Sequence, residues 1–99
     1  MKIILSITLL LTSTIAYSMD IQRGRMLTET RGCIGCHGSN GMSLRPEVPH
    51  LAGQRADYLR KSLRSYRSGR RTDPTMNSIA RQLNDVDIQD IADYYESLR

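Results

Sequence analysis

The sequence has 99 residues and a net charge of +4, and it contains two Cys and five Tyr but neither Trp nor Phe. A chain of this length forms one domain, and it can barely bury enough apolar surface to offset the entropy lost on folding. Several disulfides often compensate in small exported proteins, but two Cys exclude that solution. Nucleic-acid binding is not expected either, because the basic segment has few aromatic side chains on which bases could stack.

Residues 1–18 are predicted to be a cleaved secretory signal peptide. Lys2 gives a short positive start, residues 3–16 form an apolar stretch, and Ser18 ends a small-residue site of the kind that a signal peptidase cuts. The apolar stretch has 14 residues, fewer than the roughly 20 that span a bilayer as a helix. A retained anchor is the alternative. We expect cleavage after Ser18 and an exported, soluble domain of residues 19–99 in the periplasm of a bacterium.

The first helix of this domain is expected from Asp20 to about Arg31. Asp20 is a typical N-cap residue, and Ile21, Gly24 and Leu27 repeat at the spacing of one helical face. A Gly in a helix costs roughly 0.5–1 kcal/mol relative to Ala. We therefore expect another segment to approach this helix closely at Gly24.

Cys33, Cys36 and His37 form a C-x-x-C-H motif directly after this helix. The spacing is that of covalent haem attachment, in which each thiol adds to one vinyl group and the His lies beneath the iron. A thioredoxin-like dithiol would need a βαβ setting, a structural zinc site would normally need four ligands, and a disulfide would leave His37 unexplained. The motif therefore predicts one haem c with its iron, held covalently by Cys33 and Cys36 and ligated by His37. The haem would supply the core that the chain lacks.

A second helix is expected from about Arg55 to Ser68. It follows a Gly- and Pro-rich loop over residues 32–49, and Gly69 is placed as its C-terminal stop. The side chains spaced to face the interior are Tyr58, Leu59, Leu63 and Tyr66.

Met76 is the preferred candidate for the second axial ligand of the iron. It follows Pro74 in a segment expected to be irregular, and the 39 positions that separate it from His37 give the chain enough length to cross the haem plane. A polar loop is a poor place for a Met that merely fills a core gap. His50 is a competitor because imidazole also binds haem iron. An open sixth position, as in a ligand-binding or peroxidase-type haem protein, is the other alternative.

The last helix is expected to run from Asn84 to the end of the chain. Asn84 can cap it, with Asp87 three residues on as the reciprocal partner. The apolar residues at helical spacing are Ile88, Ile91, Ala92, Tyr95 and Leu98. No alternation typical of strands occurs in the sequence, which therefore predicts an all-α fold.

Charge is distributed unevenly between the last two of these helices. The second helix and its exit are basic, with Arg60, Lys61, Arg64, Arg67, Arg70 and Arg71, whereas the last helix carries Asp85, Asp87, Asp90, Asp93 and Glu96. Such a separation can orient a diffusing partner. We expect a redox partner with an acidic docking surface, and membrane contact that is at most peripheral.

Several segments together resemble those of a known family. They are Cys33-Ile34-Gly35-Cys36-His37-Gly38, residues 48–54 with Tyr58-Leu59, Pro74-Thr75-Met76-Asn77 and Ile91-Ala92-Asp93-Tyr94-Tyr95. In these segments the chain is similar to bacterial class I monohaem cytochromes c. The resemblance implies three to four helices around one covalent haem, with the first and last helices crossing beside it. It also implies His37 and Met76 as iron ligands, and Gly24 in contact with the last helix near Tyr94 or Tyr95.

The same resemblance suggests roles around the haem. The carbonyl of Pro49 would accept a hydrogen bond from His37, and Asn77 would orient the sulfur of Met76. The haem propionates would be held by Arg55, Tyr58 and Tyr66. The implied function is one-electron transfer without enzymatic catalysis. The alternative is a haem-bearing subunit that accepts electrons within a larger dehydrogenase such as a flavoprotein.

Overall fold

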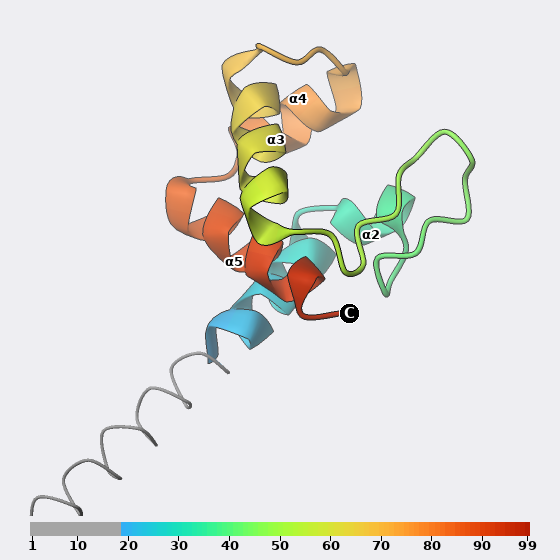
Figure 1. Cartoon of the computed structure of the whole chain (residues 1–99). Helices are drawn as coiled ribbons and strands as arrows, with labels where there is room; N and C mark the ends of the chain where they lie inside the picture. The colour runs from blue at the N-terminus through green and yellow to red at the C-terminus, as the bar shows by residue number, and fades with distance from the viewer. Residues whose placement is uncertain (1–18) are drawn as a thin grey trace, which may run out of the picture.

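The computed structural model describes residues 19–99, and this part of the chain is helical without any strand. Its elements are the helix of residues 19–30, α2 (Cys33–His37), α3 (Ala56–Ser68), α4 (Pro74–Arg81) and α5 (Asp85–Glu96) (Figure 1). The all-α prediction is confirmed. The expected signal peptide and its cleavage after Ser18 lie outside the described residues. Of the helices in residues 19–99, none combines the length and the apolar character that crossing a membrane requires.

The helix of residues 19–30 crosses α5 at Gly24. A Cβ atom at this position would overlap the carbonyl oxygen of Asp90 and lie 2.9 Å from the Cβ of Tyr94. Only Gly permits so close an approach of two helices. The close contact expected at Gly24 is therefore confirmed, and its partners are Asp90 and Tyr94.

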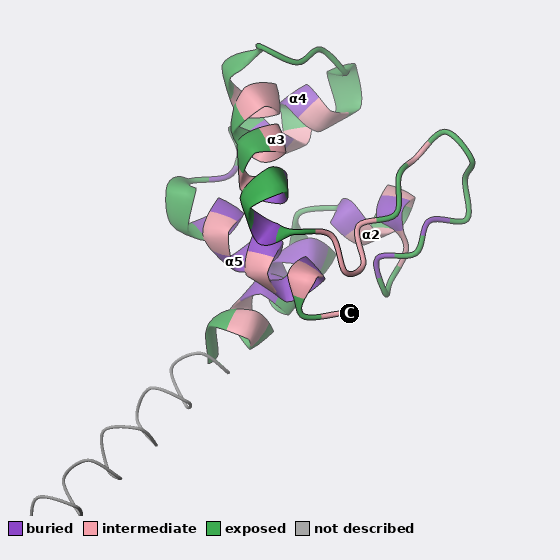
Figure 2. Cartoon of the chain, in the orientation of Figure 1, coloured by how far each residue is buried: buried purple, intermediate pink, exposed green. Residues whose placement is uncertain are grey.

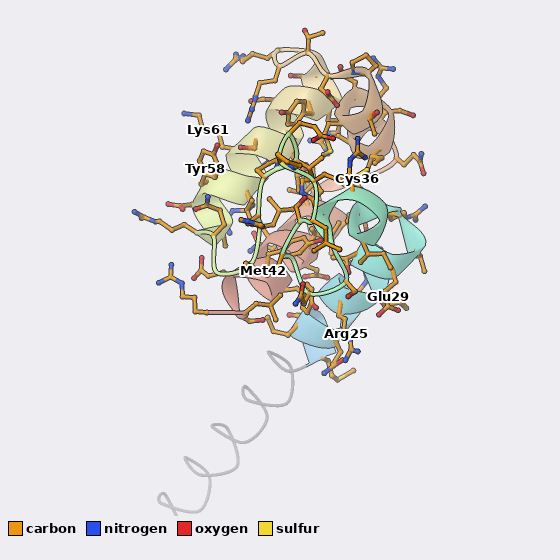
Figure 3. The ribbon with its side chains drawn as sticks, turned by 90° about the vertical axis from the view of Figure 1, so that its right-hand side faces the viewer. Arg25, Glu29, Cys36, Met42, Tyr58 and Lys61 are labelled. Carbon is orange, nitrogen blue, oxygen red and sulfur yellow. The ribbon has the colours of Figure 1, made fainter. Side chains whose placement is uncertain are left out.

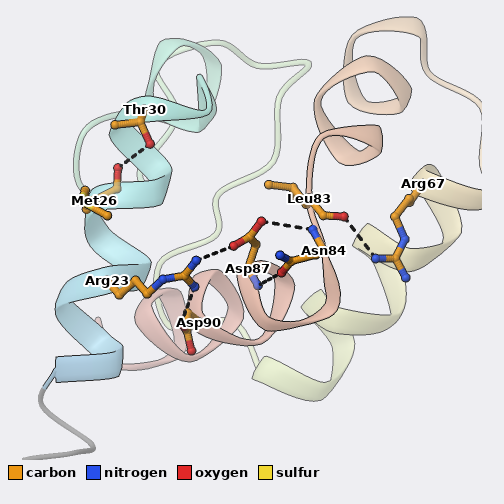
Figure 4. A network of polar contacts seen from close by, with 8 residues as sticks. All are labelled: Arg23, Met26, Thr30, Arg67, Leu83, Asn84, Asp87 and Asp90. Atoms are coloured by element: carbon orange, nitrogen blue, oxygen red, sulfur yellow. Dashed lines mark hydrogen bonds and ion pairs between the residues drawn. The ribbon is translucent and has the colours of Figure 1, made fainter.

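Arg23 forms ion pairs that connect the same two helices (Figure 4). Its guanidinium donates to Asp87 Oδ1 at 2.6 Å and to Asp90 Oδ2 at 2.7 Å. The two carboxylate side chains are only 5% and 6% exposed, whereas Arg23 is 39% exposed. Burial alone would raise the pKa of Asp87, but hydrogen bonds from Arg23 and from the backbone N–H of Asn84 hold that pKa below its usual value. The charged form of Asp87 therefore stabilises the folded protein.

Helix α5 supplies much of the hydrophobic core, which Figure 2 shows in purple along this helix and its neighbours. Asn84 accepts a hydrogen bond from the backbone N–H of Asp87, and Asp87 accepts one from that of Asn84, so the expected capping box is present. The residues expected to face inward from this helix are buried: Ile88, Ile91, Ala92 and Tyr95. Leu98 lies beyond the helix end and is partly buried against the core.

Two expected helix starts are wrong. The chain is already helical at Met19, so Asp20 lies inside a helix rather than at its N-cap. Met76 lies in α4 rather than in an irregular segment. Asp73 caps α4 by accepting from the N–H of Met76, and Pro74 occupies the first turn, where its missing N–H costs nothing. The Pro that was interpreted as a loop signal in fact begins a helix.

The expected separation of charge is largely cancelled by packing. Because α3 packs against α5, Arg67 donates to Asp85 at 2.7 Å and Arg60 lies 3.7 Å from Asp93. Arg23 binds the two carboxylates between them. The acidic face of α5 is therefore largely occupied by basic partners, and the two kinds of charge are less separated in space than in sequence.

Replacing Arg23 by Ala should lower the free energy of unfolding by about 2 kcal/mol. Breaking a buried ion pair costs about 3–5 kcal/mol, and the partial exposure of Arg23 reduces that figure. The folded-state pKa of Asp87 is depressed, so its contribution is fully present above the unfolded value of about 3.9 and is lost as pH falls through the folded value. The difference between native and variant, measured by urea unfolding from pH 7 to pH 2.5, should therefore vanish at the acidic end.

The matched control is Arg25→Ala, which breaks the exposed pair of Arg25 with Glu29. It should cost less than about 0.5 kcal/mol at any pH. Equal losses for the two variants at pH 7 would show that Arg23 does not link the helices energetically.

Candidate functional site

One cavity brings together most of the side chains predicted to bind haem. Its volume is about 360 Å³, within the range of about 300–1,000 Å³ typical of cofactor sites. Its lining residues come from α2, the segment that follows it, α3, α4 and α5, whose arrangement Figure 1 shows. The predicted residues that line it are Cys33, Cys36, His37, Pro49, Tyr58, Tyr66 and Met76. Arg55 and Asn77 are not among its lining residues.

The imidazole of His37 is fixed by the backbone of Pro49. The Nδ1 atom lies 2.9 Å from the carbonyl oxygen of Pro49, and the ring is 7% exposed. A carbonyl can only accept, so Nδ1 carries a hydrogen, and in the neutral ring Nε2 keeps its lone pair. His37 is therefore held in the tautomer that can ligate a metal through Nε2.

His50 lines the same cavity, but its hydrogen bond favours the other tautomer of the ring. The backbone N–H of Ser43 donates to His50 Nδ1 at 2.8 Å. With Nδ1 accepting, the neutral ring carries its hydrogen on Nε2, which then has no lone pair for iron. Of the two His residues at the cavity, only His37 is prepared as a ligand.

Met76 contributes to the cavity wall from the first turn of α4. Its side chain is partly buried, and its backbone N–H donates to Asp73 Oδ2 at 2.8 Å. His37 and Met76 thus come from separate helices, α2 and α4, that line one cavity. A thioether and an imidazole are the pair that holds haem iron in many electron carriers.

The two Cys residues are free thiols on α2 and both line the cavity. Burial raises the pKa of the Cys33 thiol to about 11, so this thiol is neutral near pH 7. Cys36 is more exposed, and a guanidinium nitrogen of Arg45 lies 3.6 Å from its sulfur. Figure 3 shows Cys36 among the side chains of α2.

The side chains expected near the haem propionates do not all line the cavity. Arg55 stands at the N-cap of α3, exposed, and pairs with Asp57 at 3.5 Å. Tyr58 was expected to face the interior but is 51% exposed, on the outer side of α3 near Lys61 (Figure 3). Tyr58 still lines the rim of the cavity because it is at the very start of the helix. Tyr66 lines the cavity directly.

Two basic residues that the sequence reasoning missed also line the cavity, Arg45 and Arg71. The guanidinium of Arg71 lies 4.5 Å above the ring of Tyr66, close enough for a cation–π interaction. Neither residue lies in a periodic segment, and Arg71 stands out in the sequence only as part of the basic exit of the second expected helix. Arg45 already pairs with Glu47 at 2.8 Å, so Arg71 is the stronger candidate to pair with an anionic group at the cavity, ahead of Arg55.

The buried hydroxyl of Tyr95 indicates that the cavity accepts a further group. Tyr95 is buried in α5 and lines the cavity, and within residues 19–99 its hydroxyl has no hydrogen-bond partner. An unpaired buried hydroxyl is costly, and burial raises its pKa. The remaining wall is largely apolar, with Leu59, Leu63, Ile79 and Ile91. Apolar walls, two thiols, one prepared imidazole and one thioether fit a haem.

A family model described as "Cytochrome c" matches residues 21–99. The chain belongs to the cytochrome c family. Membership implies a covalently bound haem c with its iron, and electron transfer rather than enzymatic catalysis. This agrees with the resemblance seen in the sequence.

Three comparisons place this cytochrome c among bacterial relatives. It is 46% identical to cytochrome c-554(548) of Halomonas halodenitrificans over 68 residues, which are 66% of this chain and 82% of that protein. It is 41% identical to the thiosulfate dehydrogenase electron acceptor of Stutzerimonas stutzeri, over 67% of this chain and 32% of that protein. A crystal structure of reduced cytochrome c4 from Pseudomonas stutzeri aligns with a TM-score of 0.74 and 31% identity, over 83% of this chain and 50% of that chain. The fold is therefore that of a class I cytochrome c, and this chain spans about half of the solved cytochrome c4.

Replacing His50 by Ala should leave the haem absorption spectrum unchanged, whereas His37→Ala should abolish the low-spin spectrum. The reason is the tautomer of each ring, since only His37 presents a free Nε2 lone pair. Absorption spectra of the oxidised and reduced proteins, made in cells that mature c-type cytochromes, measure the difference. Loss of the low-spin spectrum in His50→Ala would contradict the assignment.

Proposed function

We propose that this cytochrome c is a periplasmic one-electron carrier in which Cys33 and Cys36 hold the haem and His37 and Met76 bind its iron. The observation that carries the proposal is the hydrogen bond from His37 Nδ1 to the Pro49 carbonyl, because it prepares Nε2 as a ligand at the cavity that Met76 also lines. The working domain would be residues 19–99 after removal of residues 1–18.

The chemistry that the haem supplies when bound is the reversible exchange of one electron between ferrous and ferric iron. His37 and Met76 would both bind the iron, so the protein itself would supply the ligands that an incoming substrate or oxygen would have to displace. The Pro49 carbonyl orients His37 and increases the electron donation of its ring. A Met ligand favours a higher reduction potential. The apolar wall limits access of water, and the electron would pass at the mouth of the cavity to a docked partner.

The partner is proposed to present an acidic docking surface. Among the basic side chains of α3 and its exit, Lys61, Arg64 and Arg70 are exposed, whereas Arg60 and Arg67 are paired with α5 and Arg71 lines the cavity. The attraction would come from the three exposed side chains. Transient redox complexes have small interfaces, so charge mainly increases the rate of encounter.

Raising the ionic strength from about 0.02 to 0.2 M should slow the reaction with an acidic redox partner, because added salt screens the exposed charges. Stopped-flow measurement with an acidic and a basic cupredoxin as partners gives the sign of the effect. The double variant Lys61→Gln, Arg64→Gln should weaken the salt dependence, and the exposed Arg25→Gln serves as the control. A rate that rises with salt for the acidic partner would contradict this surface.

A second candidate function is a subunit that accepts electrons from a dehydrogenase, such as a flavoprotein. It is favoured by the similarity to the thiosulfate dehydrogenase electron acceptor of Stutzerimonas stutzeri. The site would be the same, and only the lifetime of the complex would differ. Purification of a tagged chain from its own cells separates the two functions, since a permanent subunit would retain the larger enzyme through gel filtration.

Replacing Met76 by Ala should open the iron and lower the reduction potential. The ferric protein should lose the weak red absorption band of a thioether ligand, and the ferrous protein should bind carbon monoxide at neutral pH. Met42→Ala is the matched control, because Met42 is exposed and lies away from the cavity lining. An unchanged red band in Met76→Ala would contradict the ligand assignment, and carbon monoxide binding by the native protein would favour a ligand-binding haem.

A further inference from the structure

Asn77 is a buried polar side chain whose amide makes three hydrogen bonds. It is 7% exposed and follows Met76 directly in α4. Its Nδ2 atom donates to the carbonyl of Tyr66 at 2.7 Å and to that of Arg71 at 2.9 Å. Its Oδ1 atom accepts from the backbone N–H of Asp73 at 2.9 Å.

These three hydrogen bonds connect three successive parts of the chain. Tyr66 lies in the last turn of α3, Arg71 in the connection between helices, and Asp73 at the N-cap of α4. Both amide hydrogens of Asn77 are used by backbone carbonyls, so neither is left for the sulfur of Met76. Asn77 therefore contacts the backbone around Met76 rather than its sulfur.

The same contacts fix the backbone on both sides of Met76. The backbone N–H of Asp73 donates to Asn77, and the carboxylate of Asp73 accepts from the N–H of Met76 at 2.8 Å. The position of Arg71 over Tyr66 adds a further contact across the connection. The start of α4 is thereby tied to the end of α3, and this is the turn that carries Met76.

We propose that Asn77 is a positioning residue that keeps Met76 at the iron by tying the first turn of α4 to the end of α3. The proposal rests on the function proposed above, in which Met76 is the ligand. A thioether is a neutral ligand on a flexible stem, and its occupancy of the iron depends on the effective concentration that a fixed backbone provides. Loosening the turn lowers that concentration without removing the sulfur.

The test is the rate at which carbon monoxide binds to the ferrous, haem-loaded protein, since the gas can enter only when Met76 has left. Asn77→Ala should increase this rate at least about tenfold, because local opening becomes more frequent when buried hydrogen bonds are lost. Asn77→Asp keeps the size and the acceptor for Asp73 but cannot donate to the two carbonyls. It should also accelerate binding, and it serves as the principal variant if Asn77→Ala fails to accumulate.

Asn84→Ala is the matched control, because it removes a polar side chain that caps α5, a helix start away from Met76. It should lower the thermal stability of the protein but leave the carbon monoxide rate unchanged. Native-like rates in both Asn77 variants, or an equal acceleration in Asn84→Ala, would overturn the proposal. Met76→Ala, measured alongside, separates the two levels: if it leaves the spectrum unchanged, the ligand assignment fails, and if it opens the iron while the Asn77 variants do not, only the positioning role fails.

Discussion

The close crossing of the first and last helices at Gly24 is the constraint on which the rest of the molecule depends. The absence of a side chain lets the helix of residues 19–30 reach the backbone of Asp90. The same approach brings Arg23 within hydrogen-bonding distance of two buried carboxylates, whose cost of burial it offsets. Helix α5, fixed in this way, presents Ile91 and Tyr95 to the cavity. The positions of these two cavity residues thus depend on the backbone contact between Gly24 and Asp90, neither of which lines the cavity.

The cofactor is an element of the fold as well as the source of the chemistry. The sequence has neither Trp nor Phe, and small domains without several disulfides or a metal are marginal in stability. Leu63 and Met76 on the cavity wall are only partly buried by the protein itself. Haem would bury them further, so in the proposed function its attachment at Cys33 and Cys36 would also complete the core. The bound haem would therefore contact both the proposed iron ligands and the hydrophobic core.

Local sequence patterns correctly predicted the structural features that depend on residues close together in the sequence. The C-x-x-C-H motif, the capping box at Asn84 and the stop at Gly69 are each complete within a few residues, and the structure has α5 and the end of α3 where these signals place them. The errors arose where the outcome depends on contacts between distant segments. The helix start at Pro74 is an exception, because its cap comes from the neighbouring Asp73 and this local signal was interpreted as a loop. The charges of α3 and α5 are separate in sequence but adjacent in space, so they neutralise each other. No periodicity marks Arg45 or Arg71 as cavity residues.

The hydrogen bond that orients His37 ends on a main-chain carbonyl, and this determines how the site can vary during evolution. Every residue at position 49 would bring a carbonyl, so substitution of a single side chain does not delete the acceptor. What can change is the path of the segment between residues 38 and 49, which sets the place of that carbonyl through contacts such as Ser43 with His50 and with the carbonyl of Cys36. Insertions and deletions in this loop, rather than point substitutions, are thus the route by which such a chain could shift the Pro49 carbonyl and so change the orientation of His37 in small steps.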